Sequence, residues 1–179
     1  DLFAYNSQIK AAKAQAEGRF DEEIVSVEIP QRKKDPIIFS KDEFIRANTS
    51  LEVLAKLRTA FKKEGGTVTA GNASGLNDGA AAMLLASEKG VKENSLTPIA
   101  KIVSSAVVGV EPRIMGIGPV KASNKALEKA GLTMDDMDII ELNEAFSAQA
   151  LACIREWGLK DNDPRINPNG GAIALGHPL

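Results

Sequence analysis

Close to its C-terminal end, the 179-residue chain carries the stretch Asn169-Gly-Gly-Ala-Ile-Ala-Leu-Gly-His-Pro178, which contains the single histidine of the sequence. His177 lies in a Gly-His-Pro turn behind a glycine-rich approach. Small neighbours leave an imidazole ring accessible, and the following proline restricts the backbone. A lone histidine often has a structural or surface role, so a structural residue and a general base are both open for His177.

A second stretch, the Asn-Glu-Ala-Phe motif at 143–146, follows the apolar run 137–142 and precedes a helical pattern. Polar side chains at the carboxyl end of a strand lie on the usual ligand side of an α/β sheet. An asparagine in this position can also cap the helix by accepting a backbone N–H bond. Asn143 is therefore a candidate either for ligand binding or for helix capping.

A third stretch, residues 66–82, consists almost wholly of small residues, and we call it the small-residue run. Such a run lets two backbones, or a backbone and a ligand, approach closely. It lacks the Gly-Lys-Ser/Thr ending of a phosphate-binding P-loop, which excludes that motif. Ser74, inside the run, lies either against an extended ligand or within tight packing.

Apolar periodicity and turn residues predict the remaining elements. Helices are expected at 2–17, from a Thr49–Glu52 capping box to Gly65, at 80–86, at 119–130 and at 144–157. Strands are expected at 23–30, 99–108 and 137–142, with a solvated loop at 31–50. The alternation of strand and helix after residue 97 predicts an α/β layered fold.

The composition excludes several classes of protein. With 44% hydrophobic residues and a net charge of −2, the chain can bury a core and is not expected to be disordered. Aromatic residues are 4% of the chain, which disfavours nucleic-acid binding. No apolar run approaches the roughly 20 residues of a membrane helix. One cysteine and one histidine predict no internal disulfide, no metal site and a reducing compartment.

Cys153, the single cysteine, lies on an apolar helical stripe that also contains Phe146, Ile154 and Trp157. This position favours a buried, unreactive thiol over a nucleophile.

In their joint order, the three stretches and Met115-Gly-Ile-Gly-Pro119 resemble the thiolases, the family of acetyl-CoA acetyltransferase and 3-ketoacyl-CoA thiolase. The resemblance runs the whole length and includes residues 20–25 and 57–61. It implies a partial, thiolase-like layered αβαβα fold of the α/β class. By the family layout, 1–70 form the latter part of the CoA-binding loop domain, 71–97 the last piece of the N-terminal core, and 98–179 the first part of the C-terminal core.

The resemblance also implies acyl transfer between an enzyme cysteine and CoA, by Claisen condensation or thiolysis of a 3-ketoacyl-CoA. His177 matches the histidine that activates the nucleophilic cysteine and helps to form an oxyanion site. Asn143 matches the asparagine that holds a catalytic water beside it. The chain begins and ends inside predicted structure, so we expect a fragment. Since both family cysteines are expected outside it, the 179 residues alone should be inactive.

Other residues match CoA-binding positions of the family. The resemblance places Ser74 and Leu76 at the pantetheine arm, Arg46 near the ADP end, Phe61 near the adenine, and Met115 and Phe146 in the acyl pocket. No permanently bound cofactor is expected; CoA and acyl-CoA are substrates. A homotetramer or homodimer is expected for the intact enzyme, in the bacterial cytoplasm, with mitochondria and peroxisomes as alternatives.

The resemblance implies in the first place part of an acetyl-CoA acetyltransferase, and two alternatives to this function stay open. Leu142 before Asn143, and Pro168 before Asn169, are more typical of degradative 3-ketoacyl-CoA or 3-ketoadipyl-CoA thiolases. A catalytically silent CoA- or lipid-binding module is the non-enzyme alternative. A ketoacyl synthase of the same fold is disfavoured, because such enzymes lack the Asn-Glu-Ala-Phe motif.

Overall fold

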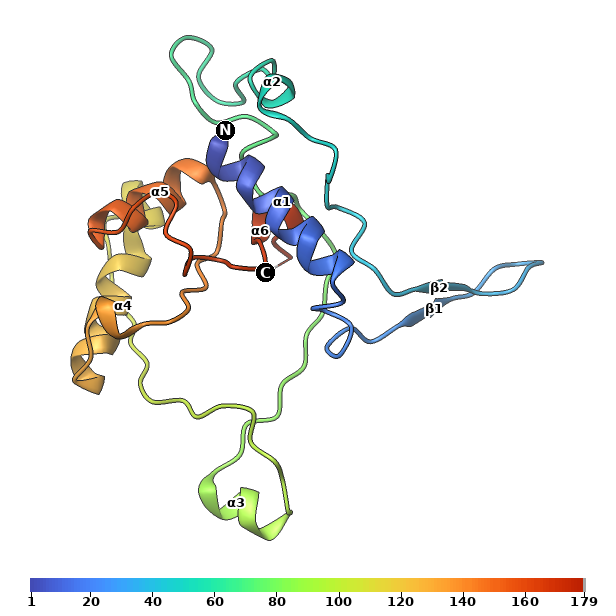
Figure 1. Cartoon of the computed structure of the whole chain (residues 1–179), viewed down its shortest axis with the longest axis vertical. Coiled ribbons are helices and arrows are strands. Elements are labelled where there is room, and N and C mark those ends of the chain that lie inside the picture. The colour runs from blue at the N-terminus through green and yellow to red at the C-terminus, as the bar shows by residue number, and fades with distance from the viewer. Residues whose placement is uncertain (179) are drawn as a thin grey trace. The chain divides into compact units, whose positions relative to one another are not determined.

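A computed structural model describes residues 1–178 as short helices and one hairpin joined by irregular segments (Figure 1). The elements are α1 (Leu2–Ala16), β1 (Val27–Ile29), β2 (Ile37–Phe39), α2 (Leu51–Leu54), α3 (Glu88–Glu93), η1 (Pro112–Ile117), α4 (Gly118–Ala130), η2 (Met134–Asp136), α5 (Ser147–Glu156) and α6 (Ala172–Leu175). They form two compact units. The first contains residues 1–77 and 138–177, and the second contains 78–137 and Pro178.

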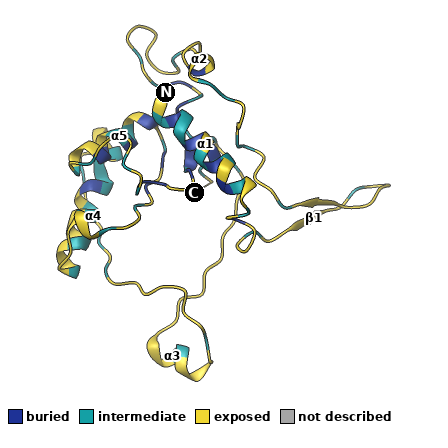
Figure 2. Ribbon diagram, in the orientation of Figure 1, coloured by how far each residue is buried: buried dark blue, intermediate teal, exposed yellow. Residues whose placement is uncertain are grey.

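Helix α1 is the centre of the first unit and confirms the helix expected at 2–17. Its buried residues recur at helical spacing and are small or polar: Ala4, Ser7, Gln8, Ala11 and Ala14. A face of small side chains lets other segments approach closely, and α1 contacts α6, α2 and α5. Figure 2 shows buried residues along α1, in contrast with the exposed β1–β2 hairpin.

Helix α5 begins at Ser147 rather than at the expected Glu144. Its buried side chains, Ala150, Cys153 and Ile154 among them, are fully covered. The middle of the apolar stripe seen in the sequence is therefore the packed face of this helix, whereas Phe146 at the N-cap is 37% exposed and Trp157 at the C-cap is half-buried.

The expectation of a solvated loop over the whole of 31–50 is wrong for residues 37–39, which form a strand. Strand β2 (Ile37–Phe39) pairs antiparallel with β1, with Val27 opposite Phe39 and Ile29 opposite Ile37. The β-branched and aromatic side chains of this short run suit a strand, but the charged residues around it hide the signal. The strand expected at 23–30 is confirmed only for Val27–Ile29.

The expected capping box at Thr49–Glu52 is also wrong. The N-cap of α2 is Ser50, whose hydroxyl accepts the Val53 N–H at 3.3 Å. The helix ends at Leu54 instead of continuing to Gly65. The apolar stripe beyond it, Leu57 and Phe61, is exposed, and an unpacked helix of this length is not stable in water.

In the second unit, α4 confirms the helix expected between Pro119 and Gly131. The helix expected at 80–86 and the strand expected at 99–108 are wrong, since both segments are irregular. Their apolar side chains are exposed. Among the described residues, segment 99–108 has no neighbouring strand, and a strand needs such a neighbour to pair its backbone groups.

The buried strand expected at 137–142 is reduced to one parallel bridge between Ile140 and Ile166. Leu142 is buried, whereas Ile139 is 61% exposed. One bridge does not make a strand, so this expectation is wrong as well.

Asn72 supports the turn where the small-residue run meets α5. Its buried amide accepts from Thr69 N–H at 2.8 Å and donates to the carbonyl of Thr67 at 2.8 Å. Its own carbonyl accepts the N–H of Ser147 at 2.9 Å. The side chain therefore shapes a turn that no regular element supports.

We expect Asn72→Ala to lower the free energy of unfolding by about 2 kcal/mol, because the buried N–H of Thr69 and the part-buried carbonyl of Thr67 lose their partner. Chemical denaturation of the complete protein measures this. Asn48→Ala, at an exposed loop position, is the matched control and should change stability by less than about 0.5 kcal/mol. Equal stability of the two variants would contradict the proposed role of the Asn72 amide.

Candidate active site

Backbone hydrogen bonds bring together the three stretches singled out in the sequence. Ala73 of the small-residue run forms an antiparallel bridge with Phe146 of the Asn-Glu-Ala-Phe motif. The N–H of His177 donates to the carbonyl of Gly75 at 3.1 Å, so the Gly-His-Pro turn joins the same junction. Segments far apart in the sequence thus meet at one place in the first unit.

At this junction the side chains of Asn143 and His177 touch. The distance between Asn143 Nδ2 and His177 Nε2 is 3.0 Å. An amide nitrogen can only donate, so in this arrangement Nε2 accepts and the ring proton lies on Nδ1. The N-cap of α5 is Phe146, which removes helix capping as the role of Asn143. The catalytic roles of both residues stay predictions.

The backbone before His177 requires glycine. Gly176 has φ +100°, in the left-handed region, and a Cβ there would lie 2.4 Å from Asn77 Cγ. Any larger residue would both strain the backbone and collide with Asn77. The direction in which the chain leaves α6 toward His177 is therefore fixed.

Of the two predicted pantetheine residues, one is anchored and one is free of packing. Ser74 is half-buried, and its hydroxyl and N–H both donate to the carbonyl of Ala145, at 3.2 and 3.0 Å. Leu76 is fully exposed. Ser74 lies within the junction, next to the segment that carries Asn143.

The two predicted aromatic residues form an exposed pair. The rings of Phe61 and Phe146 pack edge to face with centroids 6.3 Å apart. Phe61 is 79% exposed and also lines a hollow of about 190 Å³. Exposed aromatic rings beside a hollow are typical of a binding surface rather than of a core.

Arg46 and Met115 lie on other parts of the chain. Arg46 is exposed, and its guanidinium carbon lies 5.7 Å from the Phe44 ring centroid. The backbone N–H of Arg46 donates to Gln8 Oε1 at 2.7 Å. Met115 belongs to the second unit, where its side chain is 76% exposed on η1. Their binding roles, like that of Phe146 in an acyl pocket, stay predictions.

Glu144, beside Asn143, is the feature that sequence reasoning missed. Its side chain is only 1% exposed and binds Ser7, Asn167 and Ile173. Neither Ser7 nor Asn167 was a candidate, although a serine among the alanines of an apolar helix face is a usable signal for a buried polar contact.

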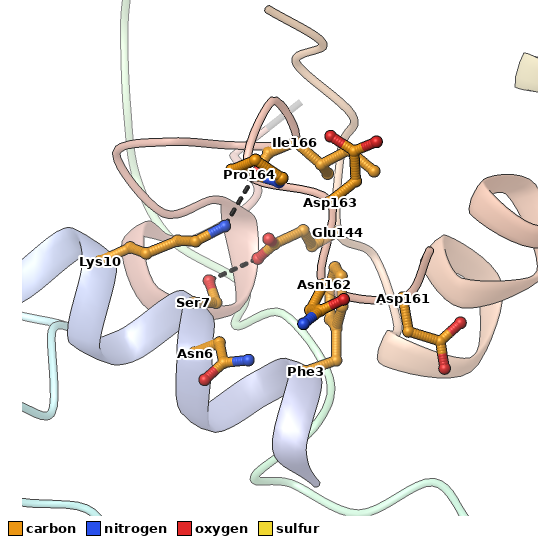
Figure 3. Close-up of a pocket in the computed structure, with 10 residues that line it drawn as sticks. All are labelled: Phe3, Asn6, Ser7, Lys10, Glu144, Asp161, Asn162, Asp163, Pro164 and Ile166. Carbon is orange, nitrogen blue, oxygen red and sulfur yellow. Dashed lines mark hydrogen bonds between the residues drawn. The ribbon is translucent and has the colours of Figure 1, made fainter. Parts of the chain in front are cut away.

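A hollow of about 220 Å³ lies beside this carboxylate (Figure 3). Lys10 lines it and donates to the carbonyl of Ile166 at 2.7 Å. Burial lowers the pKa of Lys10, while the negative charges of Glu144 and Glu141 act in the opposite direction. Asn143 and His177 do not line this hollow, so it is separate from their contact.

Two features of residues 1–178 bear on other kinds of site. No group of three or more histidine, cysteine or acidic side chains there is arranged to hold a metal ion. None of the helices found in the same residues has the length and apolar character needed to cross a bilayer.

Comparison with known proteins places this α/β chain in a family. Residues 1–89 match the model of the thiolase N-terminal domain, and residues 96–179 match that of the thiolase C-terminal domain. Beta-ketoadipyl-CoA thiolase of Acinetobacter baylyi is 61% identical over the whole chain, which covers 44% of that protein. Acetyl-CoA acetyltransferase of Chromobacterium violaceum is 56% identical, with 45% of it covered.

Solved structures agree. Bacillus anthracis acetyl-CoA acetyltransferase superposes with a TM-score of 0.94 at 49% identity, over 99% of this chain and 44% of that one. Human mitochondrial 3-ketoacyl-CoA thiolase gives 0.93 at 49% identity, over 100% of this chain and 44% of that one. The chain belongs to the thiolase family and has a partial α/β thiolase fold, as expected. It spans less than half the length of these relatives.

Cys153 is fully buried in α5, as the sequence predicted. Burial raises the pKa of its thiol, against the weaker opposing effect of the Gln149 amide, which donates to Sγ at 3.6 Å. A thiol of raised pKa in a packed helix face is a poor nucleophile.

In the complete protein, we expect Cys153→Ala to reduce turnover by less than about tenfold and stability by about 1 kcal/mol. Steady-state kinetics and denaturation measure the two effects. Cys153→Ser places a hydroxyl in the same apolar site and should cost more stability with similar turnover. A loss of turnover as large as that of a His177→Ala variant would show that the thiol takes part in the reaction.

Proposed function

We propose that this chain supplies the histidine and asparagine of a thiolase active site, and that the complete protein transfers an acyl group between an enzyme cysteine and CoA. The observation that carries the proposal is the 3.0 Å contact between Asn143 and His177, which lie on separate family motifs. The neutral imidazole of this contact is the form that can take up a proton at Nε2, once Asn143 Nδ2 no longer donates to that nitrogen.

In this proposal His177 acts on the nucleophilic cysteine of the complete protein. The imidazole takes the thiol proton, and the thiolate attacks the 3-keto carbonyl carbon of the substrate. The bond between C2 and C3 then breaks, C2 takes a proton from the second family cysteine, acetyl-CoA leaves, and the acyl group stays on the nucleophilic cysteine. A second CoA gives its thiol proton to that second cysteine and attacks the thioester. The shortened acyl-CoA leaves, and the released cysteine thiolate takes back the proton held by His177.

His177 and Asn143 have a second task in the same steps. Negative charge develops on the carbonyl oxygen each time a thiolate attacks. The protonated imidazole and the Asn143 amide are donors that can stabilise this charge, the latter directly or through a water. Because backbone bonds hold His177, and hold Ala145 two residues after Asn143, at one junction, little reorganisation is needed.

The binding of CoA is proposed for the residues around this junction. The exposed guanidinium of Arg46 suits the phosphates of the ADP end. The exposed ring of Phe61 suits the adenine, and Ser74 and Leu76 suit the pantetheine arm. Met115 and Phe146 are proposed to line the acyl pocket.

For the substrate we propose a 3-ketoacyl-CoA, with 3-ketoadipyl-CoA favoured over acetoacetyl-CoA. Leu142, buried directly before Asn143, and Pro168 support this choice. The names of relatives such as that from Acinetobacter baylyi point the same way. For the intact enzyme we also propose a homotetramer or homodimer in a bacterial cytoplasm.

The complete protein, given CoA and either substrate, should form acetyl-CoA from both, with kcat/KM about tenfold higher for 3-ketoadipyl-CoA. Chromatography of the CoA esters measures the product directly. A preference for acetoacetyl-CoA would favour the acetyl-CoA acetyltransferase assignment. Formation of acetyl-CoA from neither substrate, with CoA still bound, would support the silent binding module.

His177→Ala and Asn143→Ala should each reduce turnover by a factor on the order of 10² to 10⁴, because both serve one oxyanion site. The double variant should lose much less than the product of the two losses, since effects of residues that act together are not additive. Kinetics of the wild type and the three variants test this. Fully multiplicative losses would show that the two residues act independently.

A further inference from the structure

The Glu144 carboxylate is saturated with hydrogen-bond donors. Oε2 accepts from Ser7 Oγ at 2.6 Å and from Ile173 N–H at 3.2 Å, and Oε1 accepts from Asn167 Nδ2 at 2.8 Å. The side chain is 1% exposed, so these bonds replace water. Since all three partners donate, the charged carboxylate is the form that satisfies them.

These bonds reach the segment that carries His177. Ile173 lies in the first turn of α6, and Gly171, directly before α6, donates its N–H to Ser7 Oγ at 3.1 Å. A Cβ on Gly171 would lie 2.4 Å from Glu144 Cδ, so the close contact depends on glycine. The carboxylate therefore holds the start of α6 both directly and through the Ser7 hydroxyl. Figure 3 shows the bond between Ser7 and Glu144.

The dipeptide Asn143-Glu144 thus contacts the segment from Ile173 to His177 at two places. Glu144 binds the beginning of α6, and Asn143 touches the ring of His177, which follows the end of α6. We propose that Glu144 is a positioning residue whose carboxylate fixes His177 against Asn143. This inference rests on the proposed function of His177. A displacement of about 1 Å at a reacting group can lower a rate 10²-fold.

The geometry also predicts that glutamine is a poor replacement for Glu144. The Asn167 amide is held in one orientation, since Oδ1 accepts from Leu142 N–H at 2.7 Å and Nδ2 donates to the Leu142 carbonyl at 2.8 Å. The amide nitrogen of a glutamine would face either Asn167 Nδ2 or the N–H of Ile173. In both orientations two donors meet, and one buried contact becomes repulsive.

The test is Glu144→Gln in the complete thiolase. We expect kcat to fall by about 10- to 100-fold, while KM for CoA changes by less than about threefold, because Glu144 holds His177 rather than any proposed CoA-binding residue. Glu141→Gln, at an exposed position on the same segment, is the matched control and should keep kcat within about twofold. A kcat within twofold of wild type for Glu144→Gln would overturn the inference.

A second measurement distinguishes a positioning role of Glu144 from a loss of folded enzyme. In a His177→Ala background, Glu144→Gln should lower the residual kcat by less than about twofold, because no imidazole is left to position. If the variant only reduced the fraction of folded enzyme, the two losses would multiply, and that result would overturn the inference.

Ser7→Ala provides the test if Glu144→Gln does not fold. It leaves the carboxylate in place and removes one of its three donors together with the bridge to Gly171. We expect kcat to fall by about three- to tenfold with KM for CoA unchanged, and no such fall in the His177→Ala background. Unchanged kcat in Ser7→Ala would then count against the proposal. A wild-type protein without acyl transfer would overturn the proposed function, whereas an active wild type with an unaffected Glu144→Gln would overturn only this inference.

Discussion

The buried carboxylate of Glu144 connects segments of the first unit that belong to no common helix or sheet. Glu144 binds α1 through Ser7, the irregular segment after α5 through Asn167, and α6 through Ile173. A buried charge is tolerated only when donors surround it, and removing one partner of such a group typically costs 3–5 kcal/mol. Short helices and loops that would be marginal on their own therefore share a common anchor.

The close approach of these segments also depends on the small size of their side chains. The face of α1 that meets α6 is largely alanine, and glycine is needed next to the carboxylate and before the histidine. Small residues contribute little hydrophobic free energy, but they allow backbone atoms to come within hydrogen-bond distance. The site is thus built from backbone and polar contacts more than from a large apolar core.

How far the sequence predicts this structure depends on whether a signal is local. Helix α4 is marked by Pro119 at its start and Gly131 at its end, and α1 by Gly18 after its end, so both are predicted well. The strands expected around 99–108 and 137–142 depend on neighbouring strands, which an apolar pattern alone does not supply. Asn143 and His177 are candidates from sequence because they belong to recognisable motifs. The helical spacing of α1 can indicate that Ser7 is buried, but it does not identify its partner Glu144, and Asn167 carries no such signal.

The β1–β2 hairpin has consequences for how the protein behaves in solution. It is a two-stranded sheet within residues 1–178, so its outer edges offer unpaired backbone groups, and Val27, Ile29, Ile37 and Phe39 are all exposed beside them. Such edges are templates for adding a further strand from another molecule. The basic run Arg32-Lys33-Lys34 lies in the connecting turn, so two hairpins that approach each other repel at this end. Salt weakens this protection, because it screens the positive charges but leaves the apolar edge unchanged.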